Sequence, residues 1–264
     1  MIATRLTVFA ICIAVCCANA SGEQIVFPKG GDARVDGSFI QPYRVKWKLT
    51  GKGKDGTTKD GGTWSDTVSF IEKDGKELIA RKQIWNYGTG TETHISLVDH
   101  KTLLPRLTEF TSTVGIYYRV EYSADGQTAR YQRSPAPDAN AKSYSVSSPM
   151  EQGTLKLDFP MWDYDGGMWG LLLAAFPLSD GYSAKIPVFH LVDPEKHPAW
   201  VDFKVEGKDN VPIGGGTPIE AWHVTANSPQ SGETIRFSLS KVSPYVVGLQ
   251  QEWQGLDWTF EKID

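Results

Sequence analysis

The chain has 264 residues, with 27 basic and 31 acidic side chains, and its net charge is −4 at neutral pH. It lacks the basic surplus with which proteins hold nucleic acid or anionic membranes, so we expect no nucleic-acid partner. Nine tryptophans, ten tyrosines and eleven phenylalanines provide more aromatic area than packing alone requires. We therefore expect some of these rings to line a cavity.

Residues 1–20 have the pattern of a secretory signal peptide. Arg5 precedes an apolar run, and the segment ends in Ala18-Asn19-Ala20, whose small residues suit a signal peptidase. The run is too short to span a bilayer permanently. The sequence thus predicts export to the periplasm or the cell exterior, with no transmembrane segment in the mature chain.

The three cysteines lie inside the same leader, so the mature chain has no thiol for a disulfide, a metal or nucleophilic catalysis. Cys16 and Cys17 raise the alternative of a lipid anchor. Lipid attachment usually follows a small residue, whereas Val15 and Cys16 precede these two cysteines. Cleavage after Ala20 is the preferred reading, over lipid anchoring.

The rest of the chain, residues 21–264, reads as one β-rich domain. Apolar residues alternate with charged ones from Tyr43 to Leu49, which is the period of a strand with one dry face. Asp74-Gly75 separates the next two predicted strands and indicates a hairpin. Further short strands follow, and residues 134–142, rich in Pro and Ala, are expected to form a long loop within the domain.

One segment, Asp158–Pro177, is predicted to contain a helix. Asp165 is expected to cap it, Met168 to Phe176 forms an almost wholly apolar body, and Pro177 ends it. A helix that is apolar on all sides must be buried on most of them. We therefore expect a mainly β fold, in which a curved antiparallel sheet (a half-barrel or open barrel) wraps around one central apolar helix.

This architecture predicts an apolar cleft between the helix and the hollow face of the sheet. The competing expectation is that helix side chains fill the hollow completely. The ligand-lining candidates comprise four residues on apolar strand faces and three on the helix: Trp47, Trp64, Tyr118 and Trp258, and Trp169, Leu172 and Phe176. The leading hypothesis is a non-enzymatic binding protein for a lipid, acyl chain or other apolar molecule.

Metal and cofactor signals are weak. His190, Asp193 and His197 fall within one short segment and could offer ligands to a divalent ion. The prolines at 194 and 198 make that segment a loop with poor spacing for a rigid site. We find no phosphate-binding loop, and the sequence predicts no metal and no cofactor.

Two other function classes remain open. In the first, an envelope hydrolase or carbohydrate-active enzyme uses Asp163 or Asp165 with His190 or His197, because paired carboxylates beside aromatic rings are typical of sugar chemistry. No Gly-x-Ser-x-Gly motif is present. In the second, a structural or interaction protein binds an envelope partner along an exposed strand edge.

Three segments together resemble a known family: LVDHKTLLPRLTEF at Leu97–Phe110, MWGLLLAAFPLSDGYSAKIPVF at Met168–Phe189 and RFSLSKVSPYVVGLQQEW at Arg236–Trp253. They are similar to exported bacterial β proteins of unknown function, which in shape resemble periplasmic lipoprotein-sorting carriers. The resemblance implies a half-barrel curled over a helical plug, with a hollow that accepts an acyl chain and no established catalytic residues. Only one strong helix is visible here, whereas those carriers have several.

Overall fold

The computed structural model describes residues 25–88, 90–113, 115–134, 150–164, 167–191, 197–213, 216–227, 232, 234–253 and 255–263. The predicted signal peptide, nearly all of the predicted loop 134–142, Asp165 and Asp193 lie outside these residues. The predictions about them therefore stay predictions.

The described residues form one open sheet of 15 strands, in the order β8-β7-β6-β5-β4-β3-β2-β1-β15-β14-β13-β12-β11-β10-β9. Neighbouring strands are antiparallel, except that β9 and β10 are parallel. The strands are β1 (Tyr43–Gly53), β2 (Thr58–Lys73), β3 (Lys76–Tyr87), β4 (Gly90–Asp99), β5 (Pro105–Ser112), β6 (Tyr117–Tyr122), β7 (Thr128–Arg133), β8 (Glu151–Lys156), β9 (Trp162–Asp163), β10 (Ser183–Phe189), β11 (Ala199–Val211), β12 (Ile219–Asn227), β13 (Thr234–Leu239), β14 (Val246–Trp253) and β15 (Leu256–Lys262).

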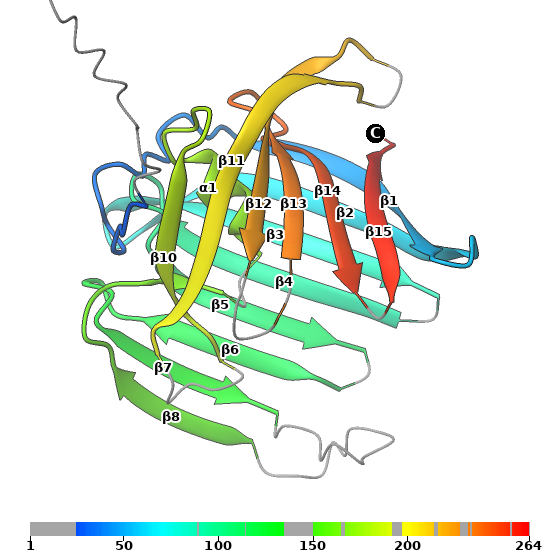
Figure 1. Cartoon of the computed structure of the whole chain (residues 1–264). Helices are drawn as coiled ribbons and strands as arrows, with labels where there is room; N and C mark the ends of the chain where they lie inside the picture. Colours follow the sequence, from blue (N-terminus) through cyan, green and yellow to red (C-terminus); the bar gives the residue numbers. More distant parts are fainter. Residues whose placement is uncertain are drawn as a thin grey trace, which may run out of the picture.

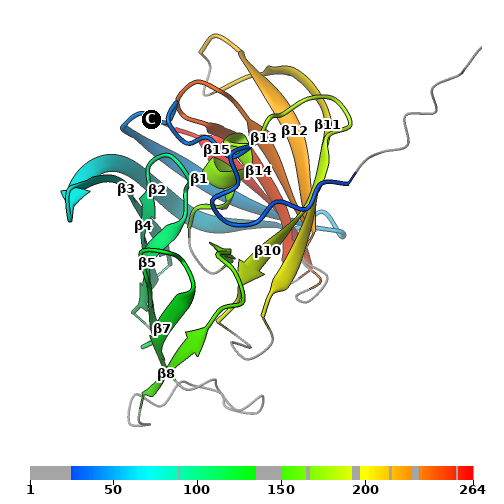
Figure 2. The same cartoon turned by 90° about the vertical axis from the view of Figure 1, so that its left-hand side faces the viewer.

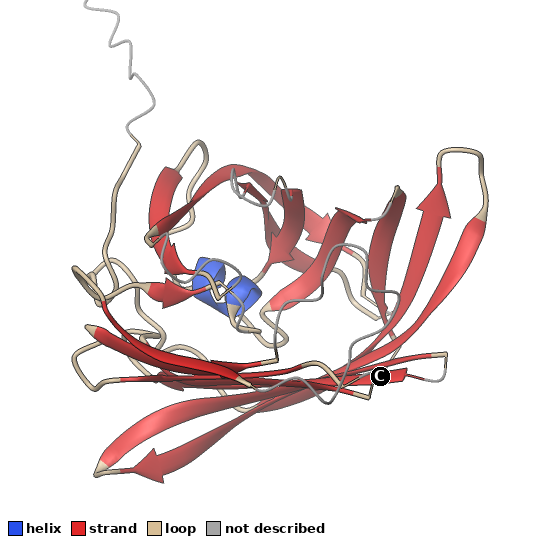
Figure 3. Ribbon diagram, turned by 90° about the horizontal axis from the view of Figure 1, so that it is seen from below, coloured by secondary structure: helices blue, strands red, loops and turns tan. Residues whose placement is uncertain are grey.

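The first and last strands pair in the middle of the sheet, where Trp47 lies opposite Lys262 and Gly53 opposite Leu256. On one side of this pairing, β1–β8 form a broad, flatter part (Figure 1). On the other side, β10–β14 curl back over it, as Figures 2 and 3 show. We call the face between the two parts the inner face, and the opposite one the outer face.

The alternation in the sequence correctly predicts β1 and the hairpin that follows it. Val45, Trp47 and Leu49 are buried on the inner face, whereas Arg44 and Lys46 point outward. At the β2–β3 turn, Asp74 and Gly75 have φ values of 55° and 69°. These left-handed conformations give the turn that matches the twist of a two-residue hairpin. The mainly β prediction is confirmed.

The predicted central apolar helix is wrong. Among the described residues, the helix α1 covers only Trp169–Ala174, which is less than two turns, and its N-cap is Met168 with no side-chain hydrogen bond. Upstream, Trp162–Asp163 instead forms β9 and pairs with Val188–Phe189 of β10. No helix among the described residues has the length and apolarity needed to cross a membrane.

Burial explains why this segment resembled a long helix. Leu171, Leu173 and Phe176 are fully buried, and so is Trp162 in β9. These side chains pack into the main cluster with inner-face residues of both parts of the sheet, such as Val68 and Phe237. The segment is apolar because it fills the core, and only five of its buried residues belong to the helix.

The turn after β4 is held by one carboxylate. Asp99 Oδ1 accepts hydrogen bonds from the backbone N–H groups of Thr102 (2.9 Å) and Lys101 (3.2 Å) and from the Thr102 hydroxyl (2.9 Å). Burial opposes ionisation of Asp99, but these hydrogen bonds and the nearby Arg106 outweigh it and hold the pKa of the carboxyl below its usual value. The ionised form therefore stabilises the fold.

Replacing Asp99 with alanine is expected to lower the free energy of unfolding by about 1–2 kcal/mol at pH 7, because three donors lose a charged acceptor. The pKa of Asp99 is lower in the folded state, so its contribution is present above the unfolded-state pKa and lost as pH falls through the folded-state pKa. Urea unfolding at several pH values measures this. A difference between the two proteins that stays constant through the acid range would contradict the assignment.

Candidate functional site: a cleft on the inner face

A cleft of about 140 Å³ lies on the inner face, where β1–β3 meet β14 and β15. Half of its lining comes from each side of the β1–β15 pairing: Trp47, Trp64, Asp66, Arg81 and Gln83 from β1–β3, and Val246, Gly248, Leu249, Gln251 and Phe260 from β14 and β15. Because these strands are adjacent in the sheet but distant in the sequence, the cleft exists only when the first and last strands pair.

Aromatic and aliphatic side chains form the walls. Trp47 and Trp64 lie directly opposite each other in β1 and β2, so both rings stand on the inner face. The Trp64 ring meets Phe260 of β15 edge-on, with centroids 6.0 Å apart. Leu249 and Val246 complete the wall on the β14 side. The surface presented to a ligand is therefore mainly apolar.

A buried ion pair forms the polar part of the lining. Arg81 Nε donates to Asp66 Oδ1 (2.9 Å) and Arg81 Nη2 donates to Asp66 Oδ2 (2.6 Å), in a two-pronged geometry. Asp66 is 2% exposed and Arg81 5%. The Tyr43 hydroxyl donates a third hydrogen bond, to Asp66 Oδ2 (2.8 Å). Burial raises the pKa of the Tyr43 phenol far above its usual value, so Tyr43 stays a neutral donor.

Gln83 connects the ion pair to the tryptophan wall. In the amide orientation that satisfies its neighbours, its oxygen accepts from Arg81 Nη2 (3.1 Å) and Trp64 Nε1 (3.2 Å), and its nitrogen donates to the Gly167 carbonyl (3.1 Å). Arg81 Nη1 donates to the same carbonyl. Burial alone would lower the pKa of the Arg81 guanidinium, but its attraction to the Asp66 carboxylate outweighs burial and raises it.

These contacts determine what the cleft can do chemically. The Asp66 carboxylate and the Arg81 guanidinium are each engaged by protein groups, so neither is available to transfer a proton or bind a charged substrate. The arrangement fits retention of an apolar group against tryptophan rings. It does not fit acid–base catalysis.

A row of rings extends along the inner face from the cleft. His94 stacks on Trp64 with centroids 6.0 Å apart, Phe110 meets His94 at 4.6 Å, and Tyr118 stacks on Phe110 at 5.0 Å. The register explains the row, because His94, Phe110 and Tyr118 are direct cross-strand partners in β4, β5 and β6. The sheet thus presents an aromatic track that begins at the cleft wall.

The family comparison bears on the same strands. The model of a family described as a protein of unknown function (DUF3108) matches residues 43–256. The chain belongs to this family. The matched range begins at the first residue of β1 and ends at the first residue of β15, so family membership covers nearly the whole sheet. A comparison with curated proteins finds no match.

The seven predicted ligand-lining residues are distributed over three hydrophobic clusters. Trp47 and Trp64 line the cleft. Trp258 belongs to the same cluster but packs over Gly51 and Gly61, beyond the cleft. Tyr118 lies on the aromatic track.

The three candidates on the predicted helix have other positions. Leu172 and Phe176 are buried in the main core. Trp169 is half-buried, and its indole N–H donates to the Tyr164 carbonyl (2.7 Å). None of the three contributes to the cleft wall.

Asp66, Arg81 and Gln83 were not predicted as site residues, although the sequence contained a signal for them. Asp66 lies between Trp64 and Val68, in phase with the apolar face of its strand, and Arg81 follows Ile79 in the same phase. When two residues of opposite charge fall at positions that face the apolar side of adjacent hairpin strands, they indicate a buried ion pair.

The predicted metal and hydrolase residues are only partly described. His190 packs against Tyr164 (4.7 Å between ring centroids) and His197 against Phe189 (6.5 Å). Asp163 is buried in β9. Among the described residues, no group of three or more His, Cys, Asp and Glu side chains is arranged to hold a metal ion.

Proposed function

We propose that this protein is a non-enzymatic binding protein that holds a slender apolar chain, such as an acyl chain, in the inner cleft. The observation that carries the proposal is an apolar cleft with two tryptophans in its wall and with the charged groups of its lining already paired. A ligand gains from burying apolar surface there and breaks no hydrogen bond of the ion pair.

The size of the cleft restricts the ligand. Its volume of about 140 Å³ is close to the roughly 150 Å³ of an apolar cavity that binds benzene, and below the roughly 300–1,000 Å³ of sites for drug-sized molecules. One slender segment fits at a time. A chain longer than the cleft would continue along the track of His94, Phe110 and Tyr118.

The proposal includes a location outside the cytoplasm, which rests on the signal-like residues 1–20. Protein purified from its own host is expected to begin at Ser21, and intact mass spectrometry measures this. Native mass spectrometry of the same sample is expected to detect an additional apolar ligand. A mass that includes the leader would contradict export by this signal.

Binding is tested with two uncharged alcohols. Decan-1-ol is a straight chain and is expected to shift the indole N–H signals of Trp47 and Trp64 in a saturable way in ¹⁵N–¹H NMR spectra. The rigid cage of 1-adamantanol is too broad for the cleft and is expected to leave both signals unchanged. Equal binding of the two alcohols, or of neither, would overturn the proposal.

A cleft-filling variant sharpens the test. Leu249→Trp places a larger ring in the cleft wall and is expected to weaken decanol binding at least about tenfold, which corresponds to about 1.4 kcal/mol. Ile84→Trp is the matched control, because Ile84 is also half-buried but lies on the outer face of β3. The control should bind decanol like the unmodified protein, and equal loss in both variants would contradict the location of the site.

A further inference from the structure

The sheet is split between β14 and β15. These strands pair only between two points: Gln250 lies opposite Thr259 at one end of the ladder, and Trp253 lies opposite Leu256 at the other. Before Gln250, β14 pairs with β13 as far as Val246. After Thr259, β15 pairs with β1 as far as Lys262. Within the described residues, Val246–Leu249 and Phe260–Lys262 therefore face each other across a gap with no ladder between them.

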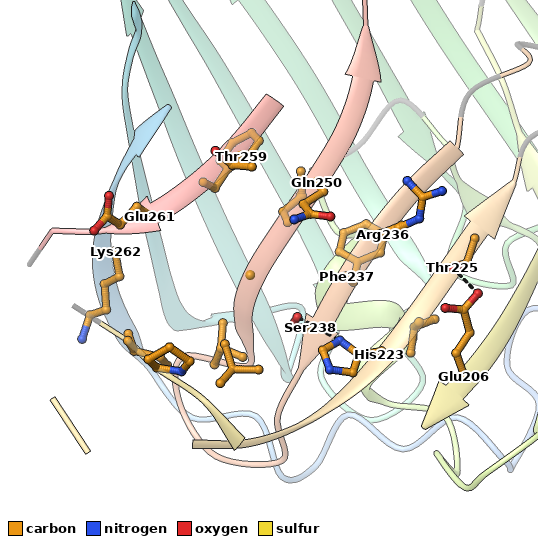
Figure 4. Close-up of a pocket in the computed structure, with 18 residues that line it drawn as sticks. Glu206, His223, Thr225, Arg236, Phe237, Ser238, Gln250, Thr259, Glu261 and Lys262 are labelled. Carbon is orange, nitrogen blue, oxygen red and sulfur yellow. Dashed lines mark hydrogen bonds between the residues drawn. The ribbon is translucent and has the colours of Figure 1, made fainter. Parts of the chain in front are cut away.

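A trough of about 480 Å³ lies over this split, and Figure 4 shows its lining. Arg236, Gln250 and Thr259 form a row across its floor, because they are direct cross-strand partners. Ile213 and Val247, which belong to a small buried cluster, also line it. The volume lies within the range of small-molecule sites.

The trough and the inner cleft share three lining residues, Gly248, Leu249 and Phe260. Gly248 lies beside the split, on the strand next to Ser238. A Cβ atom built there would lie 3.2 Å from Ser238 Oγ. The two hollows are therefore adjacent across the split between β14 and β15.

The trough carries charges of both signs. Arg236 lies on one side of the split, and Glu261 and Lys262 lie on the other (Figure 4). Glu206 accepts a hydrogen bond from the Thr225 hydroxyl (2.8 Å). A purely anionic headgroup would meet the two glutamates, and a purely cationic one would meet Arg236 and Lys262. A zwitterionic headgroup can satisfy both sets.

His223 is fixed at the same site. Its Nε2 lies 2.8 Å from Asp209 Oδ1, and its Nδ1 lies 3.4 Å from Ser238 Oγ. These three side chains include the residue types of a hydrolytic triad. Ser238, however, lies within β13 and is paired on both sides, and among the described residues no helix N-terminus or turn lies beside it to supply an oxyanion hole. His223 is thus part of the polar lining.

We propose that the trough, the split and the inner cleft form one binding site through the sheet for a zwitterionic single-chain amphiphile. The headgroup lies in the trough, with its phosphate at Arg236 and its ammonium group at Glu261. The tail passes Gly248 and lies against Trp64 and Leu249 on the inner face. This inference rests on the proposed function and adds the ligand class and the route of entry.

The test compares decylphosphocholine, below its critical micelle concentration, with decan-1-ol, decyl phosphate and phosphocholine by isothermal titration calorimetry. Decylphosphocholine is expected to bind at least about tenfold more tightly than decanol, because its headgroup adds charge-assisted contacts.

Arg236→Gln and Glu261→Gln should each remove most of that gain in affinity and leave the affinity for decanol unchanged. Arg44→Gln, an exposed arginine on the outer face of β1, is the matched control.

The outcomes separate the two proposals. If decanol binds in the cleft but decylphosphocholine binds no better, or if Arg236→Gln has no effect on it, the through-sheet site is overturned and the proposed function stands. If decyl phosphate binds more tightly than decylphosphocholine, the zwitterionic class is wrong. If none of the alkyl compounds binds, the proposed function itself fails.

A blocking variant tests the route of entry. Ser238→Ala with Gly248→Val puts a branched side chain beside the split and removes the Ser238 hydroxyl, which is the nearer of the two Ser238 atoms that a Cβ atom would meet. It is expected to abolish the preference for decylphosphocholine while the melting temperature stays near that of Ser238→Ala. If the double variant unfolds, the unmodified protein is tested instead, with decylphosphocholine that carries a nitroxide at the end of its tail. Broadening of the Trp64 indole signal in the NMR spectrum supports passage through the sheet. Broadening confined to signals of the outer face contradicts it.

Discussion

Replacing Asp66 with asparagine is expected to lower the free energy of unfolding by about 3–5 kcal/mol, because it leaves the Arg81 guanidinium charged and buried without its counterion. The side chains of the two partners are 3% and 5% exposed, so water cannot replace the lost carboxylate. Urea unfolding followed by far-UV circular dichroism measures the change.

Asp60→Asn is the matched control for this first prediction. It breaks the ion pair between Lys48 and Asp60, which also joins the neighbouring strands β1 and β2. In this pair, however, the aspartate side chain is 70% exposed. A change below about 1 kcal/mol is expected there. The double variant Asp66→Leu with Arg81→Met should recover much of the loss, since apolar groups can replace a buried pair. Equal, small changes at Asp66 and Asp60 would contradict burial of the pair.

Replacing Phe176 with alanine is expected to lower the free energy of unfolding by about 3–5 kcal/mol. The ring is fully buried and packs against Phe203 (5.0 Å between centroids) and Trp162 (5.8 Å). Its removal leaves a cavity in the main core, to which strands of both parts of the sheet contribute. Chemical unfolding monitored by tryptophan fluorescence and circular dichroism provides the measurement.

Phe27→Ala is the control for the second prediction, because Phe27 is 60% exposed and packs edge-on with Trp200, at 6.3 Å between ring centroids. Its loss should change stability by less than about 1 kcal/mol. If Phe176→Ala were as mild as this control, the segment around α1 would not be the core of the fold, although its side chains are inaccessible to water.

The strands could be predicted because their signal is local. Alternation along β1 assigns Trp47 to the apolar face, and the same period in β2 assigns Trp64 to it, so the sequence alone predicts both cleft tryptophans. The helix could not be predicted in the same way. A short apolar run that fills a core has the same composition whether it is helical, extended or looped.

The other half of the cleft depends on pairing over long distances in the sequence. Leu249 and Phe260 reach Trp64 only because β15 pairs with β1, more than 200 residues away. Periodicity within a strand does not encode this register. It also does not encode the end of the β14–β15 ladder at Gln250, from which the split follows. These features therefore required the structure.

The most direct test of the cleft as a binding site is a crystal structure of the protein with 10-bromodecan-1-ol. We predict an anomalous bromine peak on the inner face, with the alkyl chain between Trp64 and Leu249 and with the Asp66–Arg81 pair intact. An empty cleft at saturating ligand, or bromine only at other surfaces of the protein, would contradict the account.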